Sequence, residues 1–183
     1  MAKADKRKVV VTAEQIQKRV REMARQISKD YRDRTIHAVC VLENGFMFMA
    51  DLVRELDNPV VCQFVKPEFH DIRQGGSTAT EIFFSPEVEV KGQEVLLVEC
   101  IVQTGITSEF LMRNLMGRGA TSVKLAVLLD RQASRRISLQ PEYSGFQIDE
   151  SYVVGYSLGT PHLDRNLPYV AAVTRTSAAA PHS

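Results

Sequence analysis

The sequence has few cysteines, little net charge and no long apolar run. Its three cysteines form an odd set without Cys-x-x-Cys or zinc-motif spacing, so we expect reduced thiols and neither a disulfide framework nor a metal site. A formal net charge of +1 does not indicate a dedicated polyanion binder. No apolar stretch approaches the roughly 20 residues of a membrane span. We therefore expect a cytoplasmic protein with no membrane partner, and the small net charge argues against a nucleic-acid partner.

What the sequence does contain is an ordinary globular composition, 44% hydrophobic and 25% charged over 183 residues. This length favours a single domain, which we place at residues 1–173. Residues 174–183 are mostly small and polar, and we expect them to form a disordered tail.

Hydrophobic periodicity predicts alternating helices and strands. A capping box at Thr12 and Gln15 precedes apolar residues at helical spacing, which predicts a helix. The expected helices are residues 13–30, 46–56 and 107–116. Apolar runs predict strands at residues 36–42, 60–65, 81–84, 95–99, 122–129, 152–156 and 169–173. A long loop of the kind that often forms a lid is expected at 66–80, and 130–150 is predicted to be irregular.

The apolar character of these strands indicates how they are arranged. Strands that alternate with helices and lack a polar face are typical of an α/β fold with a mostly parallel, doubly wound sheet. In such sheets, ligands bind at the carboxyl ends of the strands. The functional site is therefore expected in the loops that follow them.

The segment after the strand at 95–99 has the features of an anion site. Gly105 allows the backbone to approach a ligand closely, and the amides that begin the next helix carry partial positive charge. Thr104 and Thr107 add hydroxyls directed at the same place. A phosphate-sized anion fits this arrangement. The alternative is a plain strand–helix turn with Thr107 as the helix N-cap.

This segment resembles the phosphoribosyl-diphosphate motif of type I phosphoribosyltransferases. Other segments are similar to the hypoxanthine-guanine branch of that family, in its order and approximate spacing: residues 41–42 with 46–52, 128–130, 141–146, 153–156 and 165–169. The resemblance covers residues 9–173. It implies the doubly wound sheet with a small hood or lid, and a homo-oligomer or a partner protein, because relatives are commonly dimers or tetramers.

The resemblance also assigns binding roles along the chain. It implies that the 5′-phosphate contacts Gln103, Thr104, Gly105, Ile106 and Thr107, and that ribose contacts Glu99 and Cys100. The base would meet Arg131, Tyr152 and Val153, and pyrophosphate would meet Glu43, Asn44 and Arg165. Core packing remains the alternative for Tyr152, and a solvated loop charge is the alternative for Arg131.

Two departures from the family motif affect the chemistry implied for the strand–helix loop. The family has two adjacent acids and, after two apolar residues, a third acid before Thr-Gly. This chain keeps the first as Glu99, but has Cys100 and Gln103 at the other positions. In the family the third acid is the general base near the purine N7. Glutamine cannot accept a proton at neutral pH, and losing a positioned base costs about 10²–10⁴ in rate.

Further departures concern pyrophosphate and magnesium. The family's Leu-Lys-Gly loop is Leu42-Glu43-Asn44 here, and a carboxylate at about 4 Å from a pyrophosphate charge is repelled by about 4 kcal/mol at an effective dielectric constant near 20. The acid that helps to hold magnesium in the family is Gly159, and residues 66–80 lack the family's Ser-Ser-Tyr-Gly lid motif. We therefore predict no cofactor, with Mg²⁺ needed only if the chain is active.

Three hypotheses for function follow. The first is a phosphoribosyltransferase-family protein that binds a purine nucleotide or sugar phosphate, transfers weakly or not at all, and acts as a sensor or partner subunit. The second is an active hypoxanthine/guanine phosphoribosyltransferase of purine salvage that makes IMP or GMP from phosphoribosyl diphosphate. The third is an RNA-binding regulator, against which the near-neutral charge argues. The altered residues favour the first.

Overall fold

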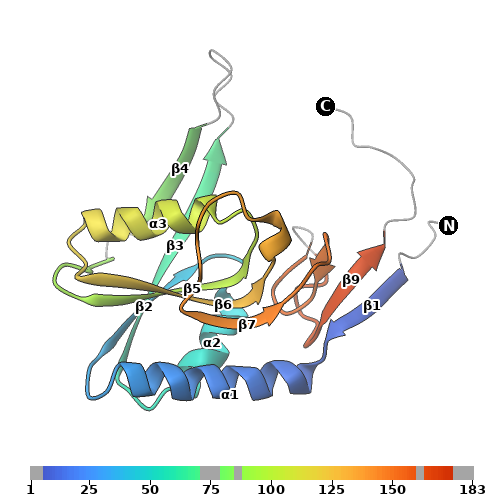
Figure 1. Ribbon diagram of the computed structural model, residues 1–183, viewed down its shortest axis with the longest axis horizontal. Helices are drawn as coiled ribbons and strands as arrows, with labels where there is room; N and C mark the ends of the chain where they lie inside the picture. The colour runs from blue at the N-terminus through green and yellow to red at the C-terminus, as the bar shows by residue number, and fades with distance from the viewer. Residues whose placement is uncertain (1–5, 71–78, 85–87, 160–162, 175–183) are drawn as a thin grey trace.

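The centre of the molecule is a six-stranded sheet (Figure 1). The computed structural model describes residues 6–70, 79–84, 88–159 and 163–174. The strands are β2 (Ile36–Val41), β3 (Val60–His70), β4 (Ala79–Phe84), β5 (Glu94–Val102), β6 (Ser122–Asp130) and β7 (Tyr143–Gln147), in the spatial order β4-β3-β2-β5-β6-β7. Only β4 is antiparallel to its neighbour. The parallel strands lie in the spatial order β3-β2-β5-β6-β7. If these strands are renumbered from one along the chain, this is the doubly wound order 2-1-3-4-5, and the order reverses between β2 and β5.

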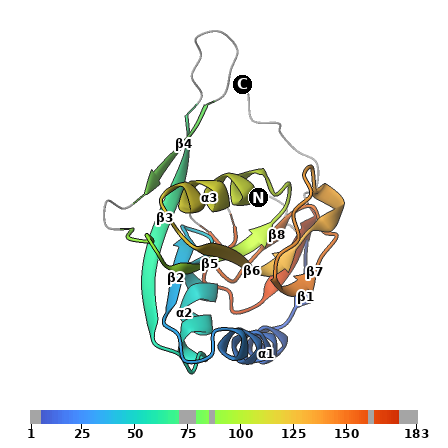
Figure 2. The ribbon, with the colours of Figure 1, turned by 60° about the vertical axis from the view of Figure 1, so that its left-hand side comes forward.

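Helices cover both faces of this sheet (Figures 1 and 2). Helices α1 (Ala13–Asp30) and α2 (Phe46–Arg54) lie on one face, and α3 (Ile106–Gly117) lies on the other. The capping box predicted for α1 is confirmed, because Thr12 N donates to Gln15 Oε1 (2.8 Å) and Gln15 N donates to Thr12 Oγ1 (3.2 Å). Among the described residues, no helix is both long and apolar enough to cross a membrane.

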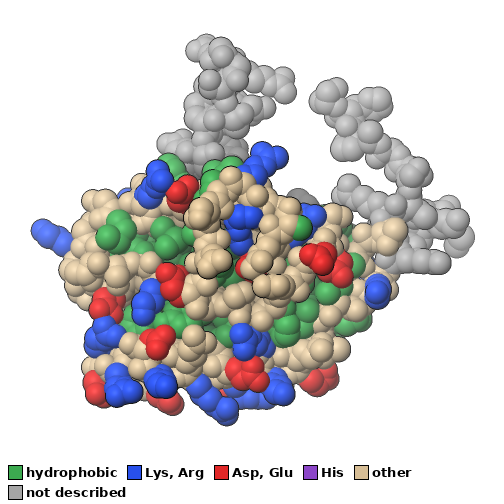
Figure 3. All heavy atoms as spheres, viewed as in Figure 1, with side chains coloured by type: hydrophobic (Ala, Val, Ile, Leu, Met, Phe, Trp, Pro, Cys, Tyr) green, Lys and Arg blue, Asp and Glu red, His purple; other side chains and the backbone are tan. Residues whose placement is uncertain are grey.

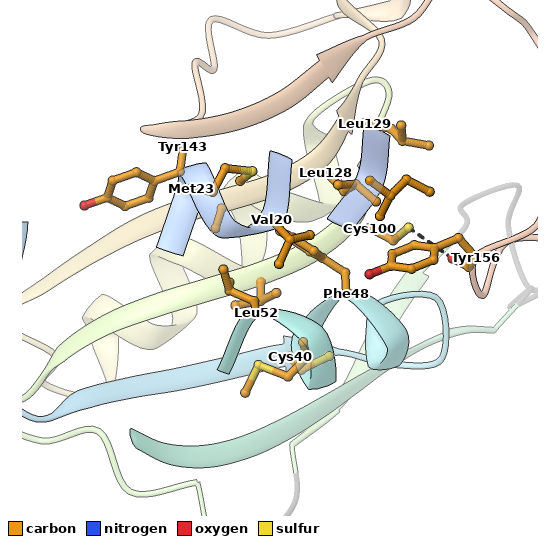
Figure 4. Close-up of a cluster of buried hydrophobic side chains, with 14 of the residues drawn as sticks. Val20, Met23, Cys40, Phe48, Leu52, Cys100, Leu128, Leu129, Tyr143 and Tyr156 are labelled. Carbon is orange, nitrogen blue, oxygen red and sulfur yellow. Dashed lines mark hydrogen bonds between the residues drawn. The ribbon is translucent and has the colours of Figure 1, made fainter. Parts of the chain in front are cut away.

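Side chains of β5 alternate between two apolar cores. Leu96 and Val98 belong to the core beneath α1 and α2, whereas Leu97 packs with Leu111 and Leu115 of α3. The close-up in Figure 4 shows part of the first core, with contributions from α1 (Val20, Met23), α2 (Phe48, Leu52) and β6 (Leu128, Leu129). Both faces of the strand are covered, which explains why its middle, Val95–Val98, is continuously apolar.

A second, smaller sheet brings together segments from opposite ends of the sequence. Strand β1 (Lys6–Val11) pairs with β9 (Val170–Thr174), which pairs with β8 (Val153–Val154), all antiparallel. Figure 1 shows this sheet beside the carboxyl ends of β5 and β6. We call this sheet, with the described residues that follow β8 (155–159 and 163–169), the hood.

The expected α/β fold with a mostly parallel doubly wound sheet is confirmed, but several boundaries were wrong. Strand β1 was missed because its first half (Lys6, Arg7, Lys8) is basic and the apolar run that follows, Val9–Val11, is too short to indicate a strand. The predicted loop at 66–80 is in part a hairpin, since β3 continues to His70 and β4 begins at Ala79; residues 71–78 lie outside the described residues. The segment 130–150, predicted to be irregular, contains a 3₁₀ turn (Gln132–Ser134) and β7.

The C-terminal boundaries also differ. The strand predicted at 152–156 has only two residues, because the chain turns at Tyr156 and Ser157, which have positive φ angles. Strand β9 includes Thr174, which the predicted tail wrongly contained, and residues 175–183 lie outside the described residues.

Candidate functional site

An open pocket of about 400 Å³ lies where the strand order reverses. Its walls come from the end of β2, the turn before α2, the end of β5 and the first turn of α3, with Pro67 of β3 closing one side. The volume suits a small ligand, and the position is the one that doubly wound sheets use for ligands. Most of the residues predicted for phosphate and ribose line this pocket; Ile106 does not, and it is 49% exposed.

The turn into α3 is shaped for an anion. Gly105 has φ +82° and is the N-cap, so the helix begins at Ile106 and the alternative of an N-cap at Thr107 is wrong. The first helical hydrogen bond of α3 is from Glu109 N to Gly105 O (2.9 Å). The amides of Thr107 and Ser108 precede that bond, and they have no acceptor within the helix. They are the amides that a phosphate would accept from.

A second loop holds this turn in place. Arg136 N donates to Thr104 O (3.0 Å), and Thr104 Oγ1 accepts from Ile106 N (3.4 Å). A Cβ at Gly105 would lie 3.1 Å from Ile137 and 3.2 Å from Arg135. The absence of a side chain at position 105 thus lets the loop after β6 pack directly on the phosphate turn.

We expect Thr107→Val to weaken a 5′-phosphate ligand such as GMP by about 1–3 kcal/mol, because it removes a hydroxyl donor to a charged group from the pocket wall. Isothermal titration of GMP measures this. Thr121→Val, in the loop before β6, is the matched control and should leave the affinity unchanged. Equal affinities of the two variants would contradict a phosphate at this turn.

Glu99 is a buried carboxyl group in the pocket wall, 7% exposed. It points to the α3 side of the sheet, where Ser108 hydrogen-bonds to it, and its Oε1 has no protein partner. Burial raises the pKa of Glu99 to about 7, although the Ser108 hydrogen bond and the charge of Arg135 lower it. An unpaired buried oxygen facing a pocket is well placed to accept from a ligand hydroxyl, as the predicted ribose contact requires.

Cys100 points to the opposite face, into the core (Figure 4). Its Sγ donates to Tyr156 O at 3.5 Å, and burial raises the pKa of this thiol to about 12. This raised pKa favours the protonated thiol at neutral pH and argues against a reactive thiolate. Cys100 also lines the pocket, and the ribose contact predicted for it stays a prediction.

The described residues of the pocket offer few ligands of their own for a divalent cation. Gln103 is exposed and lines the pocket at the predicted general-base position, and of the described residues in the wall only Glu99 is a carboxylate. Gly159 has no side chain to offer where the family has an acid. Among the described residues, no three or more His, Cys, Asp or Glu side chains are grouped to hold a metal ion. Mg²⁺ prefers several oxygen ligands, and beside the Glu99 carboxylate the others would have to come from water or from the phosphates of a ligand.

Residues predicted to bind pyrophosphate are brought together at the pocket rim. Asn44 lines the pocket, and its Oδ1 accepts from Arg165 Nη1 (3.2 Å). Glu43 forms ion pairs with Arg165 and with Lys66 of β3. The peptide bond between Leu42 and Glu43 is cis. This rim is therefore a network of paired charges.

The residues predicted for the base lie outside the pocket wall just described. Arg131 follows β6, with its backbone N donating to Val102 O (3.0 Å) and its Nε buried without a hydrogen-bond partner. Tyr152 is half-buried, and Val153 is buried in β8, opposite Ala172. Their roles toward a base stay predictions.

Sequence reasoning missed three polar residues that organise the site. Ser108 contacts Glu99, Asp130 is buried and paired with Arg135, and Ser157 Oγ donates to Asn44 O. Asp130 could have been found from the sequence, because it is a charged residue at the end of an otherwise apolar run of strand β6. Ser108 and Ser157 look like ordinary serines until the fold brings distant elements into contact.

A sequence model of the phosphoribosyl transferase domain matches residues 10–160 of this chain. The chain belongs to the phosphoribosyltransferase family. The family resemblance seen in the sequence is thereby confirmed.

Relatives of known name cover almost the whole chain. It is 31% identical to the hypoxanthine-guanine phosphoribosyltransferase of Bacillus subtilis, over 94% of this chain and 96% of that protein. The enzyme of the same name from Dictyostelium discoideum is 33% identical, over 90% and 93%. A crystal structure of a hypoxanthine-guanine phosphoribosyltransferase from Bacillus anthracis superposes with a TM-score of 0.83 at 31% identity, covering 94% of this chain and 100% of that one.

Proposed function

We propose that this phosphoribosyltransferase-family chain binds a purine nucleoside 5′-monophosphate in the pocket between β2 and β5, and that its phosphoribosyl transfer is weak. The observation that carries the proposal is a pocket that keeps the phosphate turn and Glu99 but has Gln103 where the family has its general base. Backbone amides and hydroxyls can hold a phosphate without a metal, whereas transfer needs a proton acceptor. In this proposal the chain acts as a sensor or partner subunit, as a homo-oligomer or with another protein.

A second candidate is an active hypoxanthine/guanine phosphoribosyltransferase. The names of the relatives favour it over a silent protein, since several at about 30% identity carry that name over nearly their full length. The altered residues at positions 43, 100, 103 and 159 favour slow transfer. The RNA-binding hypothesis has less support, because basic and acidic side chains are interspersed along the lower edge of the face in Figure 3, where α1 lies.

A transferase assay separates the two candidates. With phosphoribosyl diphosphate, Mg²⁺ and hypoxanthine or guanine, we expect only a trace of IMP or GMP. The double variant Cys100→Asp with Gln103→Asp should not restore a normal rate, because Glu43 and Gly159 remain. Turnover near or above about 1 s⁻¹ by the unmodified chain, which lies in the ordinary enzyme range, would favour the second candidate and contradict weak transfer.

A further inference from the structure

We infer that Glu43 is a built-in anion that occupies the pyrophosphate subsite, so that the pocket selects ligands with a single phosphate over diphosphates. This inference rests on the proposed function, because it assumes that the rim beside the phosphate turn is where a diphosphate would be bound. It assigns a specificity-determining role to a residue that lies outside the phosphate turn itself.

The carboxylate of Glu43 lies between two cations from distant parts of the chain. Its Oε1 is 3.5 Å from Nζ of Lys66 on β3, and its Oε2 is 3.6 Å from Nη2 of Arg165 in the hood. Each oxygen therefore faces a different positive charge. The Glu43 carboxylate thus neutralises the positive charges of Lys66 and Arg165, which a pyrophosphate bound at this rim would otherwise pair with.

Contacts in the hood fix this arrangement. Arg165 Nη1 donates to Asn44 Oδ1 and to Ser157 O, both at 3.2 Å. The Ser157 hydroxyl in turn donates to Asn44 O, which ties the hood to the turn that carries Glu43. Arg165 is thus held beside Glu43 by hydrogen bonds to neutral groups of the protein. Its side chain is only 25% exposed.

A ligand with one phosphate avoids the rim. Its phosphate binds at the amides of Thr107 and Ser108 at the start of α3, whereas Glu43 lies in the turn between β2 and α2. A diphosphate has to place its negative charges beside the Glu43 carboxylate or displace it from both cations. Glu43 is 57% exposed, so solvent and salt screen this repulsion, and the expected discrimination is moderate.

Binding of inorganic pyrophosphate tests the inference. We expect Glu43→Gln to raise pyrophosphate affinity about tenfold at low salt, equivalent to about 1.4 kcal/mol, and Glu43→Lys to raise it further. GMP affinity should change less than about twofold. The gain should shrink at high salt, which a merely structural effect would not do. Isothermal titration without Mg²⁺ measures both ligands.

Glu94→Gln is the matched control, because this carboxylate is also paired with an arginine (Arg34) but lies at the opposite end of β5. It should change neither affinity. An unchanged pyrophosphate affinity in both Glu43 variants, or an equal gain for GMP, would overturn the inference. Failure of the unmodified chain to bind GMP would instead contradict the proposed function, and the pyrophosphate comparison would still decide the role of Glu43.

Discussion

Glu99→Gln should stabilise the protein at pH 8 by about 3 kcal/mol while leaving its stability at pH 4.5 almost unchanged. The pKa of Glu99 is raised from 4.5 to about 7 by burial, so the folded state favours the protonated carboxyl. Stability from that protonation is fully present below the unfolded pKa and is lost as the pH rises through 7. Each unit of pKa difference corresponds to about 1.4 kcal/mol, and an amide does not titrate.

Urea unfolding of both proteins between pH 4.5 and 8 measures this difference. Glu22→Gln, an exposed carboxylate on α1, is the control and should follow the unmodified protein at every pH. Parallel stability curves for Glu99→Gln and the unmodified protein would show that Glu99 is ionised in the folded state at neutral pH. In that case, burial in the pocket wall would not raise the pKa of Glu99.

Gly155→Ala should destabilise the protein by more than about 3 kcal/mol, because it combines a steric clash with an unfavourable backbone angle. A Cβ at position 155 would lie 1.9 Å from Tyr169 O, and φ is +96° there. The residue begins the hood turn, in which Gly155 N donates to Leu158 O (2.8 Å) and Tyr156 N donates to Leu167 O (2.8 Å). Moving Tyr169 would disturb the adjoining strand β9.

Chemical unfolding followed by circular dichroism checks this prediction. Gly117→Ala is the control, since a Cβ there meets no atom within 4 Å and the residue is in α3, where alanine is the better helix former. It should be neutral or slightly stabilising. Comparable stability of the two variants would mean that the hood turn relaxes without cost.

The sheet and the phosphate turn could be predicted from the sequence because each depends on local signals. The apolar run of β5 followed by Thr104 and Gly105 predicts a buried strand and a close backbone approach, and the structure has both. Strand β1 gave no such signal. It is stabilised by pairing with β9, more than 150 residues away, and nothing in the residues of β1 themselves indicates that partner.

The charge arrangement at the rim could be predicted only in part. A carboxylate at position 43 was evident, and it was expected to repel pyrophosphate. Its pairing with Lys66 and Arg165 was not, because those residues come from β3 and the hood and meet only in the folded chain. The same reason applies to Glu99, whose raised pKa depends on burial and on Ser108 in α3.

The binding preference of the pocket is most directly tested by isothermal titration of GMP and phosphoribosyl diphosphate, each with and without Mg²⁺. We predict that GMP binds more tightly than phosphoribosyl diphosphate and that Mg²⁺ changes neither affinity greatly, because the phosphate turn is neutral and the rim is occupied by Glu43. A Mg²⁺-dependent preference for phosphoribosyl diphosphate would contradict this, and would mean an active transferase with rearranged ligands.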